Sequence, residues 1–149
     1  MIHLDVQNQS AVKRLYRRQE LINLAERICA GENMPEEAEL SLLFCDDPFI
    51  KALNKQYRGI AKATDVLSFQ QEGPSPSGRR ILGDIVISLE TVQRYCKGER
   101  DRMRDEVKLL FCHGLLHLLG RTHQKDADKK DMQRRQALYL DTIVEDAWH

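Results

Sequence analysis

Phe111–His123 reads F-C-H-G-L-L-H-L-L-G-R-T-H, and this stretch organises the rest of the chain. It holds three of the five histidines, His113, His117 and His123. Positions i and i+4 lie one above the other on a helix, so His113 and His117 present two imidazoles on one face. The leucines around them predict a buried helix. Gly120 can take the left-handed conformation that ends a helix, which would bring His123 toward the same point.

Three histidines in this pattern predict a catalytic zinc site. Two ligands on a helix and a third after its end leave one tetrahedral position open, whereas structural sites fill all four. Nitrogen donors with an open position suit Zn²⁺, and nickel or copper could bind the same donors in vitro. The spacing H-x-x-x-H-x-x-G-x-x-H is also that of the zincin metalloproteases, except that Gly114 stands where their general-base Glu would be. The missing Glu disfavours a peptidase.

The composition fits one domain, which we expect to span residues 1–149. The 23 Lys and Arg balance the 23 Asp and Glu, so global attraction to nucleic acid is absent and any RNA contact must come from a local patch. Between residues 121 and 135 bases outnumber acids by six to three. This run predicts either an RNA-binding patch or a solvated helix face. The bases are Arg121, Lys125, Lys129, Lys130, Arg134 and Arg135.

Several features predict a cytoplasmic protein. The four cysteines are widely spaced without a C-x-x-C pair, a pattern typical of reduced cysteines. The N-terminal residues show no basic-then-apolar signal pattern. The apolar run Leu109–Leu119 is too short for a bilayer, which needs about 20 residues.

Hydrophobic periodicity predicts the element order β-α-β-α-β-β-α-α-α. We expect strands at Ile2–Val6, Glu39–Cys45, Thr64–Gln70 and Ile81–Leu89, the last two pairing as a long hairpin. We expect helices from a Ser10 cap to about Gly31, from Asp46 to Gly59, over Glu90–Lys97, from about Asp101 and from about Asp126. The expected fold is therefore α+β, a single compact domain with one mixed sheet of about four strands, about five covering helices, and the metal site on the histidine helix.

Three blocks resemble the YbeY endoribonucleases, also called rRNA maturation factors. The family's HGxLHLxGYDH is matched by His113–His123, its N-x-x-Y-R…T-D-V-L-S-F by Asn54–Phe69, and its G-D-I-x-I-S by Gly83–Ser88. The blocks occur in the family's order. The resemblance implies one zinc held by three histidines and cleavage of single-stranded RNA. It also implies work on ribosomal RNA, chiefly the three-prime end of the small-subunit RNA, ribosome quality control, and the small subunit or its proteins as partners.

The chain departs from the family pattern near the last histidine. Arg121 and Thr122 replace the family's Tyr and Asp, and Gln70 stands where the family usually has Pro. A carboxylate before the last histidine could orient a ligand imidazole through a hydrogen bond, and Thr122 could do so only without a charge. Asp84, in an otherwise apolar strand, needs a partner. We expect it either to orient a ligand histidine or to make a purely structural hydrogen bond.

Other residues receive roles beside the metal. His113 and His117 are assigned to catalysis through the metal they hold. Arg58 is the candidate for binding the scissile phosphate, because a guanidinium matches phosphate oxygens bidentately. Its alternative is to bond the last helix carbonyls beside Gly59. Sequence-independent RNA affinity is assigned to Lys129, Lys130, Arg134 and Arg135.

The leading function is a zinc-dependent, single-strand-specific endoribonuclease. The alternative is a ribosome-assembly or RNA-binding factor with a structural zinc and little nuclease activity. An open coordination position separates the two. The sequence leaves open whether water or the RNA's 2′-hydroxyl is the nucleophile, and which oligomer forms.

Overall fold

The computed structural model describes residues 2–34, 37–71, 76–121 and 126–140. It confirms the predicted element order and the predicted α+β class. The strands are β1 (Ile2–Asn8), β2 (Ala38–Cys45), β3 (Val66–Gln70) and β4 (Arg80–Ser88). The helices are α1 (Arg18–Gly31), α2 (Asp47–Arg58), α3 (Leu89–Tyr95), α4 (Arg100–Leu118) and α5 (Asp126–Leu140).

The four strands form one mixed sheet in the order β1-β2-β4-β3. β1, β2 and β4 run parallel, and β3 pairs with β4 in the antiparallel direction at one edge, as predicted for the hairpin. The pairing places Val66 opposite Ile87 and Gln70 opposite Gly83. Gly83 has φ +143°, and a Cβ there would overlap the carbonyl oxygen of Phe69. Only glycine therefore allows this close approach of β3 to β4.

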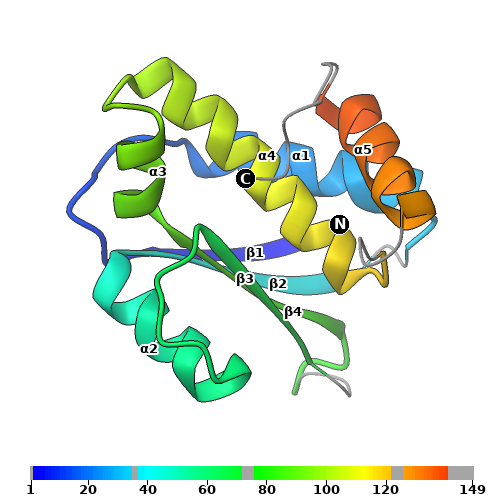
Figure 1. Cartoon of the computed structure of the whole chain (residues 1–149). Coiled ribbons are helices and arrows are strands. Elements are labelled where there is room, and N and C mark those ends of the chain that lie inside the picture. Colours follow the sequence, from blue (N-terminus) through cyan, green and yellow to red (C-terminus); the bar gives the residue numbers. More distant parts are fainter. Residues whose placement is uncertain (1, 35–36, 72–75, 122–125, 141–149) are drawn as a thin grey trace.

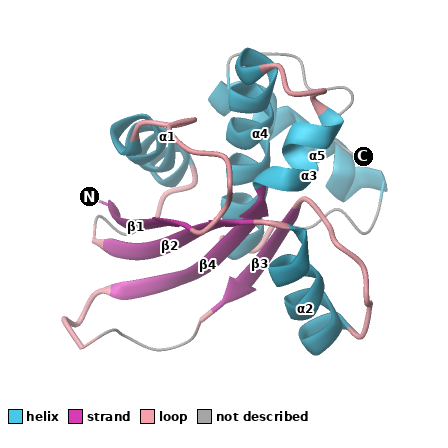
Figure 2. Ribbon diagram, turned by 90° about the vertical axis from the view of Figure 1, so that its left-hand side faces the viewer, coloured by secondary structure: helices cyan, strands magenta, loops and turns pink. Residues whose placement is uncertain are grey.

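The helices cover the two faces of the sheet unequally. α1, α4 and α5 lie over one face and α2 lies alone on the other (Figures 1 and 2). Ile85 of β4 and Phe111 and Leu115 of α4 are fully buried in the main core between α4 and the sheet. A smaller cluster joins Ile50 of α2 to the opposite face. α4 is thus the central helix, and it carries the histidines.

Within the described ranges, no helix combines the length and the apolar character that crossing a membrane requires. α4 is the longest at 19 residues, but its first two turns are rich in Arg and Asp.

The start of α1 corrects one prediction. The helix expected from Ser10 begins only at Arg18. Ser10 instead lies in a loop, where its Oγ donates to Asn8 Oδ1 at 2.6 Å and to the carbonyl of Val12 at 2.9 Å. Arg14 has φ +58°, which a right-handed helix excludes. The buried Leu15 belongs to this loop and continues the apolar spacing without a helix.

Candidate active site

A cleft of about 610 Å³ lies between α4, the edge strand β3 and the end of α2. His113 and His117 of α4 line it together with Arg58 of α2. These are residues assigned to the metal and to the phosphate from the sequence, and the fold brings them to one place. The other lining residues are Val66, Leu67, Ser68, Gln70, Leu118, Gly120 and Arg121.

His113 is held in one orientation by the neighbouring helix. Its Nδ1 lies 2.9 Å from Oε1 of Gln136, a fully buried residue of α5. With the amide oxygen of Gln136 facing the ring, Nδ1 is the donor and Nε2 keeps its lone pair. Sequence reasoning missed this role for Gln136. The available signal was a polar side chain in the otherwise apolar row of Met132 and Leu140.

The histidine pair fits a bound metal. The rings of His113 and His117 have centroids 4.7 Å apart at an interplanar angle of 69°. The tautomer fixed by Gln136 is the one in which Nε2 of His113 can bind a metal. His123 and Thr122 lie outside the described residues, and the described ranges contain no group of three His, Cys, Asp or Glu that could hold an ion. The described part of the chain thus supplies two imidazole donors.

Gly114 packs directly against the sheet. A Cβ there would lie 2.9 Å from Ser68 Oγ and 3.1 Å from Ile85 Cγ2. Ser68 Oγ also donates to the carbonyl oxygen of Gly114 at 3.3 Å. A Glu in this position, as in a zincin, would overlap Ser68 and Ile85 of the sheet. The packing therefore removes the peptidase alternative on geometric grounds as well.

Arg58 is the last residue of α2. Gly59 ends the helix with φ +72°, and the backbone N–H groups of Gly59 and Ile60 bond to the last carbonyls. In the described part of the chain, no hydrogen bond or ion pair holds the Arg58 guanidinium. The carbonyl-bonding alternative is thus not what the structure contains, and the guanidinium is available to a ligand.

Comparison with known proteins decides the family. The family model described as Endoribonuclease YbeY matches residues 4–144. The chain belongs to this family. A relative named Endoribonuclease YbeY from Pelotomaculum thermopropionicum is 43% identical over 120 residues, which cover 78% of this chain and 79% of the relative. A relative of the same name from Moorella thermoacetica is 40% identical over 134 residues, covering 82% and 86%.

The solved structures include a similar chain. The solution structure of TM1509 from Thermotoga maritima matches with a TM-score of 0.57 and 25% identity, covering 93% of this chain and 87% of that one. Membership in the YbeY family confirms the resemblance predicted from the motifs. It also confirms the predicted class of enzyme, an endoribonuclease that hydrolyses RNA.

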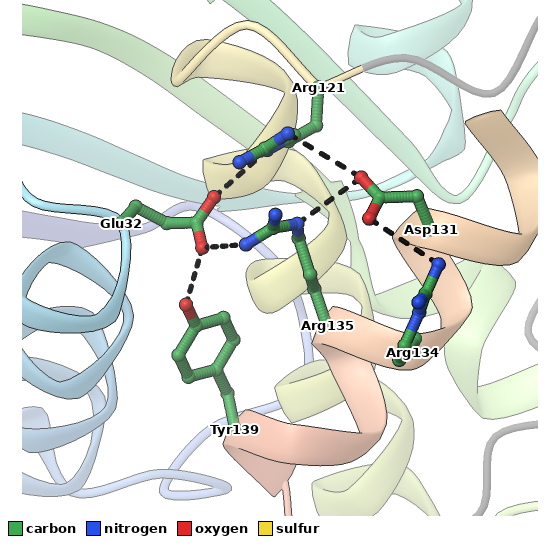
Figure 3. A network of polar contacts seen from close by, with 6 residues as sticks. All are labelled: Glu32, Arg121, Asp131, Arg134, Arg135 and Tyr139. Carbon is green, nitrogen blue, oxygen red and sulfur yellow. Dashed lines mark hydrogen bonds and ion pairs between the residues drawn. The ribbon is translucent and has the colours of Figure 1, made fainter.

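An ion-pair network in this YbeY-family chain involves residues assigned to RNA binding. Glu32, at the end of α1, has only 3% of its side chain exposed. It accepts from Arg121 Nε at 3.0 Å, from Arg135 at 2.7 Å and from the Tyr139 hydroxyl. Burial opposes the charge on Glu32, but the bonds from Tyr139 and Arg121 and the charge of Arg135 outweigh it, so its pKa is lowered. Asp131 extends the network (Figure 3).

The predicted basic patch stays a prediction, and this network shows what two of its members contact. Arg135 is paired with both Glu32 and Asp131, so its main role is internal. Arg134 lies 3.8 Å from Asp131 with 76% of its side chain exposed. Lys129 and Lys130 are exposed on α5. None of these four lines the histidine cleft, whose described cations are Arg58 and Arg121.

Asp84 lies apart from the histidines. In β4 it follows Gly83, whose Cα faces Leu118 of α4, so its side chain points to the opposite, α2 face of the sheet. There it accepts a hydrogen bond from the Gln71 amide and lines a separate cavity beside α2. Of the two expectations for Asp84, the structure shows a structural hydrogen bond and not an orienting bond to a histidine.

Proposed function

We propose that this YbeY-family endoribonuclease is zinc-dependent and cuts single-stranded RNA. The observation that carries the proposal is the cleft lined by His113, His117 and Arg58, whose guanidinium has no partner among the described residues. A metal on one wall and a cation on the other suit a phosphodiester, because phosphoryl transfer is helped mainly by positioning and by positive charge around its oxygens.

The proposed roles of His113, His117, Arg58 and Gln136 rest on the positions of their side chains, and those of His123 and Thr122 rest on the sequence motif alone. His113, His117 and His123 hold the zinc through neutral imidazoles. When bound, the zinc either lowers the pKa of a water to about 7 or polarises a phosphoryl oxygen while the RNA's 2′-hydroxyl attacks. Arg58 binds the nonbridging oxygens of the scissile phosphate. Gln136 keeps His113 in the metal-binding tautomer, and Thr122 is proposed to steady the third histidine without adding charge.

The proposed substrate is ribosomal RNA, chiefly the three-prime end of the small-subunit RNA, and the proposed place of action is the cytoplasm. The small subunit or its proteins are the proposed partners, and ribosome quality control the proposed process. The proposed substrate, place of action, partners and process rest on the family resemblance. Lys129, Lys130 and Arg134 are proposed as outer contacts to the RNA backbone, with Arg135 supporting them from the network.

The test compares zinc-loaded wild type with His117→Ala on single-stranded and structured RNA, mapping the end groups of the products. We expect wild type to cut single strands, and His117→Ala to lose both zinc and cleavage. X-ray absorption should count three nitrogen ligands and one oxygen. Four protein ligands with no cleavage would instead favour the assembly factor with a structural zinc.

A further inference from the structure

A second cavity lies on the other side of β3 from the histidine cleft. It measures about 390 Å³ and lies between α2 and the open face of the sheet. Phe49, Leu53 and Tyr57 line it from α2 at i, i+4 and i+8, and Phe69 lines it from β3. Tyr57 is aromatic, yet 61% of its surface is exposed.

The ring centroid of Tyr57 lies 5.0 Å from that of Phe69, and the two ring planes meet at an angle of 54°. Phe69 packs against the small core beneath, so it supports one side of Tyr57 and leaves the other open.

This groove and the histidine cleft lie on either side of β3. Tyr57 directly precedes Arg58, and Phe69 lies between Ser68 and Gln70; Arg58, Ser68 and Gln70 all line the cleft. The two hollows are therefore separated only by the edge strand β3, with the end of α2 beside both. A polymer whose phosphate lies at Arg58 would place a neighbouring unit at Tyr57.

The charges around the groove suit a nucleic-acid backbone. From residue 48 to residue 64 the chain has four cations and no acid. Lys51, Lys55 and Arg58 follow i, i+4 and i+7, so they share one exposed side of α2, about 170° around the helix from the aromatic row, and Lys62 is exposed beyond the helix end. On α5, by contrast, Arg134 and Arg135 lie against Asp131. α2 thus brings a cation, Arg58, to the histidine cleft, whereas the exposed Lys129 and Lys130 of α5 line neither hollow.

The floor of the groove favours a neutral occupant. Its polar lining residues are Asp84, Gln71, whose amide donates to Asp84, and Ser41. A carboxylate repels a phosphate but can face the polar edge of a base. A nucleobase inside the groove, with its phosphate at Arg58, suits this lining.

We propose that Tyr57, supported by Phe69, stacks on an unpaired nucleobase next to the phosphate bound at Arg58, an inference that rests on the proposed endoribonuclease function. Every base has a π face, so such a platform tolerates any sequence but requires an unstacked base. Bases in a duplex are stacked and paired and cannot enter the groove. Tyr57 thereby supplies a physical reason for single-strand preference that neither the zinc nor Arg58 provides.

The test measures affinity with and without bases. The zinc-loaded full chain is titrated into a labelled 2′-O-methyl hexauridylate, shown by electrophoresis to remain intact, and into the same hexamer made of abasic riboses. Tyr57→Ala should weaken binding of the base-containing hexamer by about tenfold, the scale of losing one base–aromatic stack, and leave the abasic hexamer within twofold. Tyr57→Trp should keep wild-type affinity. Tyr95→Ala is the matched control, since Tyr95 is an exposed tyrosine of α3, 45% accessible, that lines neither hollow.

The outcomes separate this inference from the proposed function. Wild type that neither binds nor cuts RNA would reject the endoribonuclease proposal itself. If wild type binds and cuts RNA but Tyr57→Ala binds both hexamers with wild-type affinity, base stacking at Tyr57 is rejected. The endoribonuclease proposal would stand, and the groove would then be a candidate site for a protein partner. As an independent measurement on unaltered protein, cross-links from a 4-thiouridine hexamer should map to the peptide containing Tyr57 or Phe69. Cross-links confined to α5 would overturn the proposal.

Discussion

Arg58 lies one residue before the glycine that ends α2, and its guanidinium has no internal partner in the described part of the chain. We expect Arg58→Ala to lower the cleavage rate by roughly a hundredfold or more, the usual cost of losing one charge-stabilising donor. Zinc content and melting temperature should stay near wild type, because the side chain is exposed. Arg58→Lys should recover only part of the rate, since an ammonium cannot hold two phosphate oxygens in a planar fork.

Arg102→Ala is the matched control for Arg58. Arg102 belongs to the first turn of α4, has 51% of its side chain exposed and lies 3.7 Å from Glu99, an exposed pair of small energetic weight. The Arg102→Ala variant should cut RNA at the wild-type rate. Full activity of Arg58→Ala would reject the phosphate-binding role, and a large drop in its melting temperature would show that the arginine supports the fold instead.

Gly114 allows the histidine helix to approach the sheet more closely than any other residue would. Gly114→Ala gains up to about 1 kcal/mol in helix propensity, but the new Cβ meets Ser68 Oγ at 2.9 Å and Ile85 at 3.1 Å. Overpacking of this kind costs about 1–3 kcal/mol, so we expect a net loss of roughly 1 kcal/mol in the free energy of unfolding. Adding Ser68→Ala removes the atom nearest to the new Cβ, so the double variant should regain part of the lost free energy of unfolding. Urea unfolding of the two variants measures both effects, and an additive double variant would contradict the packing argument.

At the scale of elements, periodicity predicted the order and nearly all the limits of the helices and strands, because alternating and helical spacings report burial directly. It placed the start of α1 too early, since Leu15 is buried from a loop and keeps a helical spacing. The face on which Asp84 lies depends on the register beside Gly83, and the partner of His113 comes from α5, 23 residues away. Such contacts exist only after the elements pack, so local sequence could not supply them.

The hydrogen bond between Gln136 of α5 and His113 of α4 can be tested by substitution. Gln136→Met keeps the volume of the side chain but removes the acceptor that fixes the tautomer of His113. We expect zinc affinity to fall by roughly tenfold to a hundredfold, the usual effect of losing such a partner. The melting temperature of the metal-free protein should stay near wild type, because a methionine fills the same space. Gln133→Met, a half-buried neighbour on the same helix, is the control. Unchanged zinc affinity in Gln136→Met would show that the His113 bond does not serve the metal.

At the scale of the whole molecule, one buried carboxylate joins three segments. Glu32 at the end of α1 binds Arg121 from the turn after α4, and Arg135 and Tyr139 from α5. Arg121 stands where the family motif has Tyr. In this chain the turn after α4 is therefore held to α1 by an ion pair with Glu32. Breaking a buried pair costs more than making one gains, because the remaining charge is left without its partner.

The pH dependence of stability follows from the lowered pKa of Glu32. A carboxylate with a lowered pKa in the folded state adds stability above its ordinary value of 4.5, and that stability is lost as the pH falls through the folded-state value. We expect Glu32→Gln to lower the free energy of unfolding by roughly 2 kcal/mol at neutral pH, a discounted value because both arginines are partly exposed. The difference from wild type should shrink steadily below pH 4.5 and vanish in strong acid. Urea unfolding at a series of pH values measures it, with Glu20→Gln, an exposed residue of the same helix, as the control. A difference that stayed constant across the series would mean that Glu32 acts through packing and not through its charge. Side-chain packing, and not the ion pair with Arg121, would then hold the turn after α4 in place.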